Sequence, residues 1–199
     1  MSINEESYNK IAVKWAEIRQ NAVPLKPVRE FAGKVQSGGT ILDVGCGTGF
    51  PNTVYLSEQG FRITGIDSAA EMIKIAQSTN IPGASFFETD FFDFRTEIKF
   101  DGIIAWDSLW HLPKAKQELI YPKMCEMLHP GGYFLFSHGN VDDEHVDQMF
   151  GEPFYYGALE KEKVAGLLNS NHFSIEFLYE NYIENNDQRD FVVLARKNP

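Results

Sequence analysis

The sequence predicts an α/β fold: a doubly wound, seven-stranded, mostly parallel sheet with an antiparallel C-terminal hairpin and helices on both faces. Short apolar runs alternate with segments of helical periodicity between residues 40 and 170, which is typical of parallel strands joined by right-handed crossovers. Two later apolar runs flank the polar turn Glu184–Gln188, which indicates a hairpin. A chain of 199 residues has the length of one domain, so we expect a single domain over residues 1–199.

The N-terminal segment is predicted to be helical. Apolar residues recur at helical spacing over residues 5–20, namely Tyr8, Ile11, Trp15 and Ile18. Pro24 and Pro27 interrupt this pattern, and a second short helix is expected over residues 28–35. The glycine pair at 38–39 then separates the segment from the first strand.

The remaining elements follow from apolar runs and turn residues. Thr40–Val44 is an apolar run, as expected of a strand buried on both faces. Further strands are expected over residues 61–66, 85–88, 101–106, 133–137, 173–179 and 191–196, and helices over residues 52–59, 68–77, 113–128 and 160–170. In such sheets ligands bind outside the carboxyl ends of the central strands, so the loops after the first four strands are expected to share one site.

Four local features refine this assignment. Ser68 and Glu71 have the spacing of a capping box, which predicts a helix start there. Pro122 is expected to kink or split the helix over residues 113–128. Residues 130–132, Pro-Gly-Gly, predict a turn, and residues 139–158 are expected to be irregular.

Composition limits the partners. Eighteen Lys and Arg against 28 Asp and Glu give a net charge of −10, which opposes binding to nucleic-acid phosphates or to an anionic membrane. Cys46 and Cys125 form neither a disulfide framework nor a metal-ligand spacing, so no metal is expected. Residues 1–20 lack the apolar centre of a signal peptide, and no apolar run reaches the ~20 residues of a membrane span. We expect a cytoplasmic protein that is a monomer or homodimer.

The strongest local signal is the glycine loop after the first strand, Gly45-Cys46-Gly47-Thr48-Gly49. Such a loop lets a ligand approach the backbone closely. The loop departs in two ways from the G-x-G-x-x-G pattern of dinucleotide-binding proteins. Phe50 stands at the position of the third glycine, and Asp43 would repel a pyrophosphate. An ammonium or sulfonium would be attracted to Asp43, by roughly 4 kcal/mol at ~4 Å before desolvation is subtracted. Alternatively, Asp43 only caps the next helix.

Two further acids follow neighbouring strands. Asp67 ends the second strand at a spacing close to that at which an acid meets a ribose hydroxyl pair. Asp90 follows the third strand beside Phe91 and Phe92, a setting that suits an adenine amine against an apolar wall. The alternatives are a plain strand-end residue for Asp67 and a turn residue for Asp90.

On these motifs the chain resembles the class I, Rossmann-like S-adenosylmethionine-dependent methyltransferases of the small-molecule type. The matching segments, in family order, are residues 41–49, 63–76, 86–94, 100–113 and 128–137. The resemblance implies S-adenosylmethionine as cofactor and a helical lid over residues 1–37. The cofactor-binding residues that it implies are Asp43, Gly45, Cys46, Gly47 and Gly49 for the methionine part, Asp67 and Ser68 for the ribose, Met72, Asp90 and Phe91 for adenine, Trp106 at the methionine end, and Tyr8, Trp15 and Arg19 in the lid.

Two histidines are candidate catalytic residues. His111 lies in the loop after the fourth strand, and its ordinary pKa near 6.5 suits removal of a proton from the acceptor. His138 ends the fifth strand and is the second candidate. The alternative for His111 is a structural bond to its own loop. Because the methyl donor is already activated, alignment supplies much of the rate and a base is optional.

The acceptor loop favours a small molecule. Asp107-Ser108-Leu109-Trp110 keeps the acid and the aromatic residue of the signature found in methyltransferases of nucleic-acid amines but lacks both prolines. We therefore predict methyl transfer from S-adenosylmethionine to a small-molecule nucleophile by in-line displacement. One alternative is a non-catalytic S-adenosylmethionine-binding protein. Another is an NAD(P)-dependent oxidoreductase, against which Phe50, Asp43 and the lack of a Tyr-x-x-x-Lys pair all argue.

Overall fold

The structure is a computed structural model that describes residues 2–199. The helices are α1 (Ile3–Arg19), α2 (Lys26–Lys34), α3 (Asn52–Glu58), α4 (Ala70–Ser78), α5 (Ile120–Met127) and α6 (Lys161–Ser170), with 3-10 turns η1 (Leu109–His111) and η2 (Lys114–Leu119). The strands are β1 (Thr40–Val44), β2 (Arg62–Asp67), β3 (Ala84–Glu88), β4 (Phe100–Ala105), β5 (Leu128–His138), β6 (Glu144–Met149), β7 (Glu152–Gly157), β8 (Phe173–Glu184) and β9 (Asp187–Lys197).

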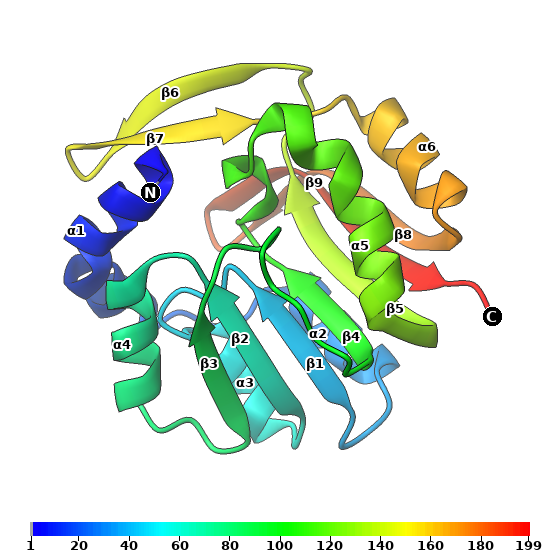
Figure 1. Ribbon diagram of the computed structural model, residues 1–199, viewed down its shortest axis with the longest axis horizontal. Helices are drawn as coiled ribbons and strands as arrows, with labels where there is room; N and C mark the ends of the chain where they lie inside the picture. The colour runs from blue at the N-terminus through cyan, green and yellow to red at the C-terminus, as the bar shows by residue number, and fades with distance from the viewer. Residues whose placement is uncertain (1) are drawn as a thin grey trace.

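The main sheet confirms the predicted topology. Its strand order is β3-β2-β1-β4-β5-β9-β8 (Figure 1). Strands β1 to β5 are parallel, whereas β9 runs antiparallel to both β5 and β8. The strand order changes direction between β1 and β4, and the crevice at such a point is where open α/β sheets bind ligands.

Helices cover both faces of this sheet. Figure 1 shows α5 and α6 in front of the sheet and α2 and α3 behind it. The front layer packs Tyr121 and Leu168 against the sheet, and the rear layer packs Phe31 and Leu56; all four side chains are fully buried. Among residues 2–199, no helix has both the length and the apolar character required to cross a bilayer.

The prediction of an irregular segment over residues 139–158 was wrong, because β6 and β7 form a separate two-stranded antiparallel sheet there. The β6 side chains are mostly exposed and show no buried face, so the sequence carried little strand signal. Pairing with β7 and the burial of Phe154 against α1 decide the structure. This hairpin lies across the carboxyl end of the main sheet (Figure 1).

The capping box predicted at Ser68 and Glu71 was also wrong. Helix α4 has Ala69 at its N-cap and no side-chain cap bond. The carboxylate of Asp67 accepts the Ala69 N–H at 2.9 Å instead. A capping box does occur at the start of α1, where Ser2 and Glu5 bond reciprocally.

Two boundaries differ by smaller amounts. The helix expected over residues 113–128 is split, as predicted, but at the junction of η2 and α5, so that Pro122 lies in the first turn of α5, where its missing N–H is tolerated. Pro130 to Gly132 lie within β5 rather than in a turn, and the pairing of β4 with β5 shifts register there.

Candidate active site

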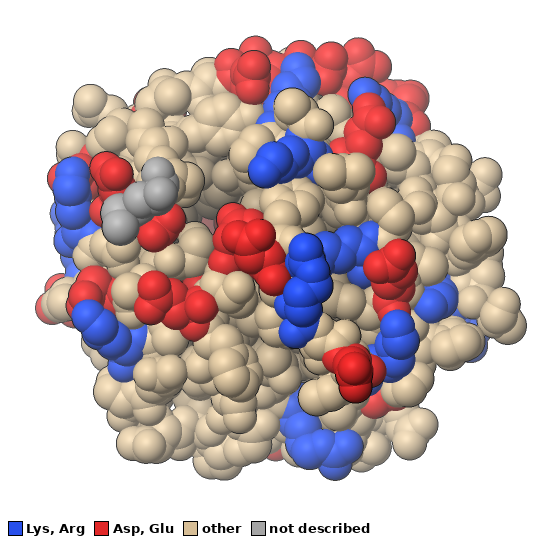
Figure 2. All heavy atoms as spheres, in the orientation of Figure 1, with Lys and Arg blue, Asp and Glu red and all other residues tan. Residues whose placement is uncertain are grey.

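A cavity of about 420 Å³ opens at the carboxyl ends of β1, β2 and β4. Helix α1 covers one side of it, and Figure 2 shows the surface hollowed beside that helix, with acidic side chains nearby. The cavity is lined by most of the predicted site residues: Tyr8, Trp15, Arg19, Asp43, Gly45, Cys46, Gly47, Asp67, Ser68, Met72, Asp90, Phe91, Trp106 and His111. Loops distant in sequence therefore converge on one site, as expected from parallel strands.

Two predicted residues do not line this cavity. Gly49 lies on the far side of its loop, where a Cβ atom would come within 2.8 Å of Ile81 and where φ is +84°. His138 is fully buried on the α5 face, with Nδ1 donating to the carbonyl of Gly139 at 2.8 Å and the ring beside Phe191. The structure thus brings Gly49 and His138 into the packing around the site rather than into the cavity.

The glycine loop is shaped by a close approach from the β4 side. Gly45 has φ +71°, and a Cβ atom there would lie 2.4 Å from the Cβ of Ser108. The Ser108 hydroxyl donates to the Val44 carbonyl at 2.7 Å, which ties the loop after β4 to the end of β1. Only glycine at position 45 permits both the backbone conformation and this contact.

Asp43 lies beneath the loop and is 4% exposed. Its Oδ2 accepts a hydrogen bond from the Thr53 hydroxyl of α3 at 2.6 Å. Burial raises the pKa of Asp43 to about 7; the Thr53 bond opposes this rise and the nearby Asp67 adds to it. A cationic ligand stabilises the ionised form of a buried acid whose pKa is raised.

Asp67 organises the loop with its carboxylate. One oxygen accepts the Gly47 N–H and the other accepts the Ala69 N–H, both at 2.9 Å. Burial raises the pKa of Asp67, and these backbone bonds oppose the rise. Each carboxylate oxygen can accept a further bond, so Asp67 can hold the loop and still accept from a ligand's hydroxyl groups.

The adenine candidates form a different wall. Met72 is 1% exposed and packs with Ile11 and Phe154, so it serves both the core and the cavity surface. Asp90 is exposed, and its Oδ1 accepts the Phe92 N–H at 2.7 Å, which is a turn bond. Asp90 thus makes the turn bond that was its alternative in the sequence, and both Met72 and Asp90 also line the cavity.

Helix α1 supplies the remaining wall. Tyr8 and Trp15 meet edge to face with ring centroids 5.9 Å apart, and the Arg19 guanidinium lies 5.6 Å from the Trp15 ring. Within residues 2–199, the buried Arg19 Nε has no hydrogen-bond partner. A Cβ atom on Gly47 would lie 3.7 Å from the Trp15 indole nitrogen, so α1 directly covers the glycine loop.

His111 is held by three polar groups. Nδ1 lies 2.9 Å from the Tyr155 carbonyl, and Nε2 lies 2.9 Å from the Tyr8 hydroxyl and 3.3 Å from Trp110 Nε1. Burial lowers the pKa of His111 to about 4, although the Tyr155 carbonyl and Asp107 favour the charged form. The imidazole is therefore neutral near pH 7.

Sequence reasoning gave no site role to two residues that line the cavity, Asn4 and Asp107. Asn4 is buried, and its amide bonds both backbone groups of Tyr155. Asp107 adopts φ +55°, and both its carboxylate oxygens accept from Arg189 of β9. Asn4 carries no periodic signal, and the Asp107–Arg189 pair joins positions 82 residues apart, so only the fold reveals them.

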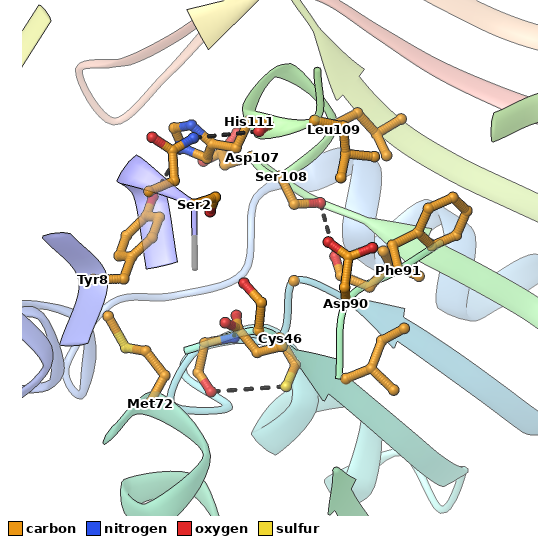
Figure 3. Close-up of a pocket in the computed structure, with 18 of the residues that line it drawn as sticks. Ser2, Tyr8, Cys46, Met72, Asp90, Phe91, Asp107, Ser108, Leu109 and His111 are labelled. Atoms are coloured by element: carbon orange, nitrogen blue, oxygen red, sulfur yellow. Dashed lines mark hydrogen bonds between the residues drawn. The ribbon is translucent and has the colours of Figure 1, made fainter. Parts of the chain in front are cut away.

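The donor set of the cavity fits S-adenosylmethionine. The buried Asp43 and the partly buried Asp67 face a glycine loop, and aromatic and apolar side chains line the remainder. The cavity therefore offers charge compensation for a cation beside surfaces for an adenosine. Within residues 2–199, His, Cys, Asp and Glu form no cluster able to hold a metal ion. Figure 3 shows Tyr8, Cys46, Met72, Asp90 and His111 arranged around the open space.

Comparison with known proteins gives a consistent result. Residues 15–180 match the family described as a methyltransferase domain. The chain is 30% identical over 146 residues to a protein of Geobacillus sp. (strain WCH70), and 32% identical over 139 residues to YqeM of Bacillus subtilis (strain 168), both named as candidate methyltransferases. These alignments cover 67% and 65% of this chain but only 59% and 54% of the relatives, so the chain spans somewhat over half their length.

A solved structure shows the same fold. The 1,6-didemethyltoxoflavin-N1-methyltransferase of Burkholderia thailandensis, with bound 1,6-didemethyltoxoflavin and S-adenosylhomocysteine, aligns with a TM-score of 0.70 at 20% sequence identity. The alignment covers 98% of this chain and 87% of that one.

Proposed function

Because this chain belongs to the class I S-adenosylmethionine-dependent methyltransferases, we propose that it transfers the methyl group to a small-molecule nucleophile by in-line displacement. The observation that carries the proposal is the arrangement of Asp43 and Asp67 beneath a glycine loop, inside a cavity of about 420 Å³. This volume lies within the range of small-molecule sites. The Burkholderia relative, whose structure holds a small molecule, supports the same acceptor class.

The roles that we propose for the side chains are those implied by the family resemblance, and the position of these residues on the cavity supports them. Asp43 and the backbone of Gly45 and Gly47 would hold the amino-acid end of the cofactor, together with Arg19 of α1. Asp67 would accept from the ribose hydroxyls. Met72, Asp90 and Phe91 would hold the adenine group, with Ser68 and Cys46 beside them on the cavity wall. When bound, the cofactor supplies a methyl group on a positively charged sulfur.

The remaining residues prepare the transfer. Trp106 is 6% exposed at the end of β4, and together with Tyr8 and Trp15 it limits the access of water to the reacting atoms. Holding two reactants in line supplies roughly 7–11 kcal/mol of the barrier reduction. We assign the lid to α1, since α2 packs against the sheet with Phe31 fully buried. His111 lines the cavity and is the candidate to hold the proton that the acceptor loses.

The first test is calorimetry with S-adenosylhomocysteine and with NADH. We expect heat with the first ligand only, and Asp67→Ala is expected to weaken that binding by ~10-fold or more, because hydrogen bonds to a charged acceptor contribute roughly 1.5–3 kcal/mol each. Binding of NADH in preference would contradict the proposal. A labelled-methyl assay over a broad acceptor panel then separates an enzyme from a non-catalytic binder, which would bind the cofactor and transfer nothing.

A further inference from the structure

The hydrogen bonds around His111 fix its tautomer in two independent ways. The Tyr155 carbonyl can only accept, so Nδ1, 2.9 Å away, carries the proton. The Trp110 indole N–H can only donate, so Nε2, 3.3 Å away, is unprotonated. Because Nε2 has no proton, the Tyr8 hydroxyl at 2.9 Å must donate its own hydrogen to Nε2.

This arrangement leaves Tyr8, rather than His111, with a free acceptor site. Nε2 is already covered by two donors, whereas the Tyr8 oxygen has donated its only hydrogen and keeps its lone pairs. Tyr8 lines the cavity and is half-buried. Figure 3 shows Tyr8, on α1, and His111, after β4, on the same side of that cavity.

We propose that Tyr8 is the catalytic residue that takes the proton of the acceptor and passes its own proton to His111, so that the acceptor is an amine or a hydroxyl compound whose nucleophilic atom carries a proton. This inference rests on the proposed function and names the substrate class of the same site. Removal of the proton would then depend on the position of α1, because Tyr8 lies on that helix.

The step balances in atoms and charge. The acceptor atom gains the methyl group as the electron pair of the carbon–sulfur bond stays on sulfur; Tyr8 Oη gains the acceptor's proton, and His111 Nε2 gains the Tyr8 proton. Tyr8 begins and ends neutral, in keeping with a phenol whose pKa is raised by burial and by nearby Asp67. The positive charge that arises on His111 replaces the one lost from sulfur, so the net charge of the cavity is unchanged.

The surroundings of His111 support a transient imidazolium. The Tyr155 carbonyl accepts from Nδ1, and Asp107 raises the pKa of His111 by its charge, although burial lowers this pKa to about 4 in the free protein. The Asp107 carboxylate is itself held by Arg189 and by the Ser137 hydroxyl at 2.9 Å. The acid is thus fixed in place without contacting His111 directly.

The test compares Tyr8→Phe with Tyr156→Phe. The Tyr8→Phe variant keeps the ring that packs 4.8 Å from Phe154 but removes the hydroxyl. Tyr156 is the matched control, because its ring lies 5.0 Å from the His111 ring and no hydroxyl bond joins the two. Labelled S-adenosylmethionine is the methyl donor, and small primary amines, phenols and carboxylic acids are the acceptors.

For amines and phenols, Tyr8→Phe is expected to lower kcat by ~10²–10⁴-fold with a much smaller change in affinity for S-adenosylhomocysteine, because the ring is kept. For phenols the deficit is expected to shrink as the pH approaches the pKa of the acceptor, because a phenolate has no proton to remove. Tyr156→Phe is expected to keep wild-type kcat. Equal kcat in Tyr8→Phe and wild type, or transfer only to carboxylic acids, which carry no proton to remove near pH 7, would overturn the proposal.

Nitrogen NMR of His111 gives a readout that needs no acceptor. We expect a protonated Nδ1 and a bare Nε2 in the wild type, and a higher His111 pKa in Tyr8→Phe, because a bond that favours the neutral imidazole is lost. A protonated Nε2 in the free wild type would overturn the proposal. If the wild type transfers methyl to no acceptor, the proposed function fails, while this measurement still decides the tautomer on which the Tyr8 step depends.

Discussion

At the scale of single residues, ionised Asp43 lowers the stability of the fold and at the same time favours the binding of a cation. Asp43 is 4% exposed, and the pKa of its carboxyl group is raised to about 7, mainly by burial. A group whose pKa is raised on folding stabilises the fold fully below its unfolded pKa, and that stabilisation is lost as the pH rises through the folded value. Above pH 7 the ionised Asp43 therefore weakens the fold that a cationic ligand would restore.

Asp43→Asn is expected to stabilise the protein and weaken cofactor binding together. The rise in the pKa of Asp43 from 3.8 to about 7 corresponds to on the order of 4 kcal/mol as an upper bound. Asparagine can still accept the Thr53 hydroxyl bond. We expect a higher Tm at pH 8 and at least ~10-fold weaker binding of S-adenosylmethionine. A lower Tm at pH 8 would show that the ionised carboxylate does not destabilise the fold.

Cofactor affinity is expected to depend on pH through the same group. Below pH 7 Asp43 is largely protonated and offers no charge to an ammonium group, so affinity for S-adenosylmethionine is expected to rise with pH through about 7 and then level off. Calorimetry near pH 7 in buffers of different ionisation enthalpy should detect proton release on binding. The Asp43→Asn variant should bind the cofactor without releasing a proton. If the wild type also releases no proton on binding, Asp43 is not the group that pairs with the cofactor's charge.

At the scale of elements, α1 is attached to the β6–β7 hairpin by the Asn4 side chain, which bonds both backbone groups of Tyr155 as a neighbouring strand would. The Asn4 amide accepts the Tyr155 N–H at 2.7 Å and donates to the Tyr155 carbonyl at 2.9 Å. The Ser7 hydroxyl donates to the Pro153 carbonyl at 2.6 Å. These bonds place Tyr8 and Trp15 over the cavity, so the hairpin positions the lid helix.

Asn4→Ala is expected to release α1 locally. It removes three part-buried hydrogen bonds and leaves backbone groups of Tyr155 and His111 without their partner, which costs roughly 1–3 kcal/mol. Hydrogen exchange should speed up across residues 3–19 and 152–157 and stay slow in β1 and β4. The exposed Asn21, just beyond α1, gives the control Asn21→Ala. Unchanged exchange in α1 would show that other contacts hold the helix.

At the scale of the whole molecule, the site lies where elements from different regions of the chain meet. The sheet presents the acids and the glycine loop, α1 and the hairpin cover them, and β9 supplies Arg189 to hold Asp107. A ligand that binds this junction contacts elements from both ends of the chain. Its binding is therefore expected to stabilise the entire fold, because it binds the folded state alone.

S-adenosylhomocysteine at about 100 times its Kd should stabilise the protein by ~2.7 kcal/mol. For a chain of 199 residues this predicts a rise in Tm of roughly 5–10 °C. NADH at equal concentration is the matched ligand control and should give no rise. An equal rise with both ligands would argue against selection of a cation by Asp43 and Asp67.

The sequence by itself determined the order of strands and helices, the antiparallel ending, and a cluster of acids at one edge of the sheet, because apolar periodicity and the parallel topology are local consequences of residue order. Only the tertiary structure decided that residues 144–157 form a hairpin, that Asp67 rather than Ser68 bonds at the start of α4, and that Gly49 and His138 face away from the cavity. It also brought Tyr8 against His111, 103 positions along the chain. Such contacts depend on how packed elements meet, and residue spacing carries no record of that.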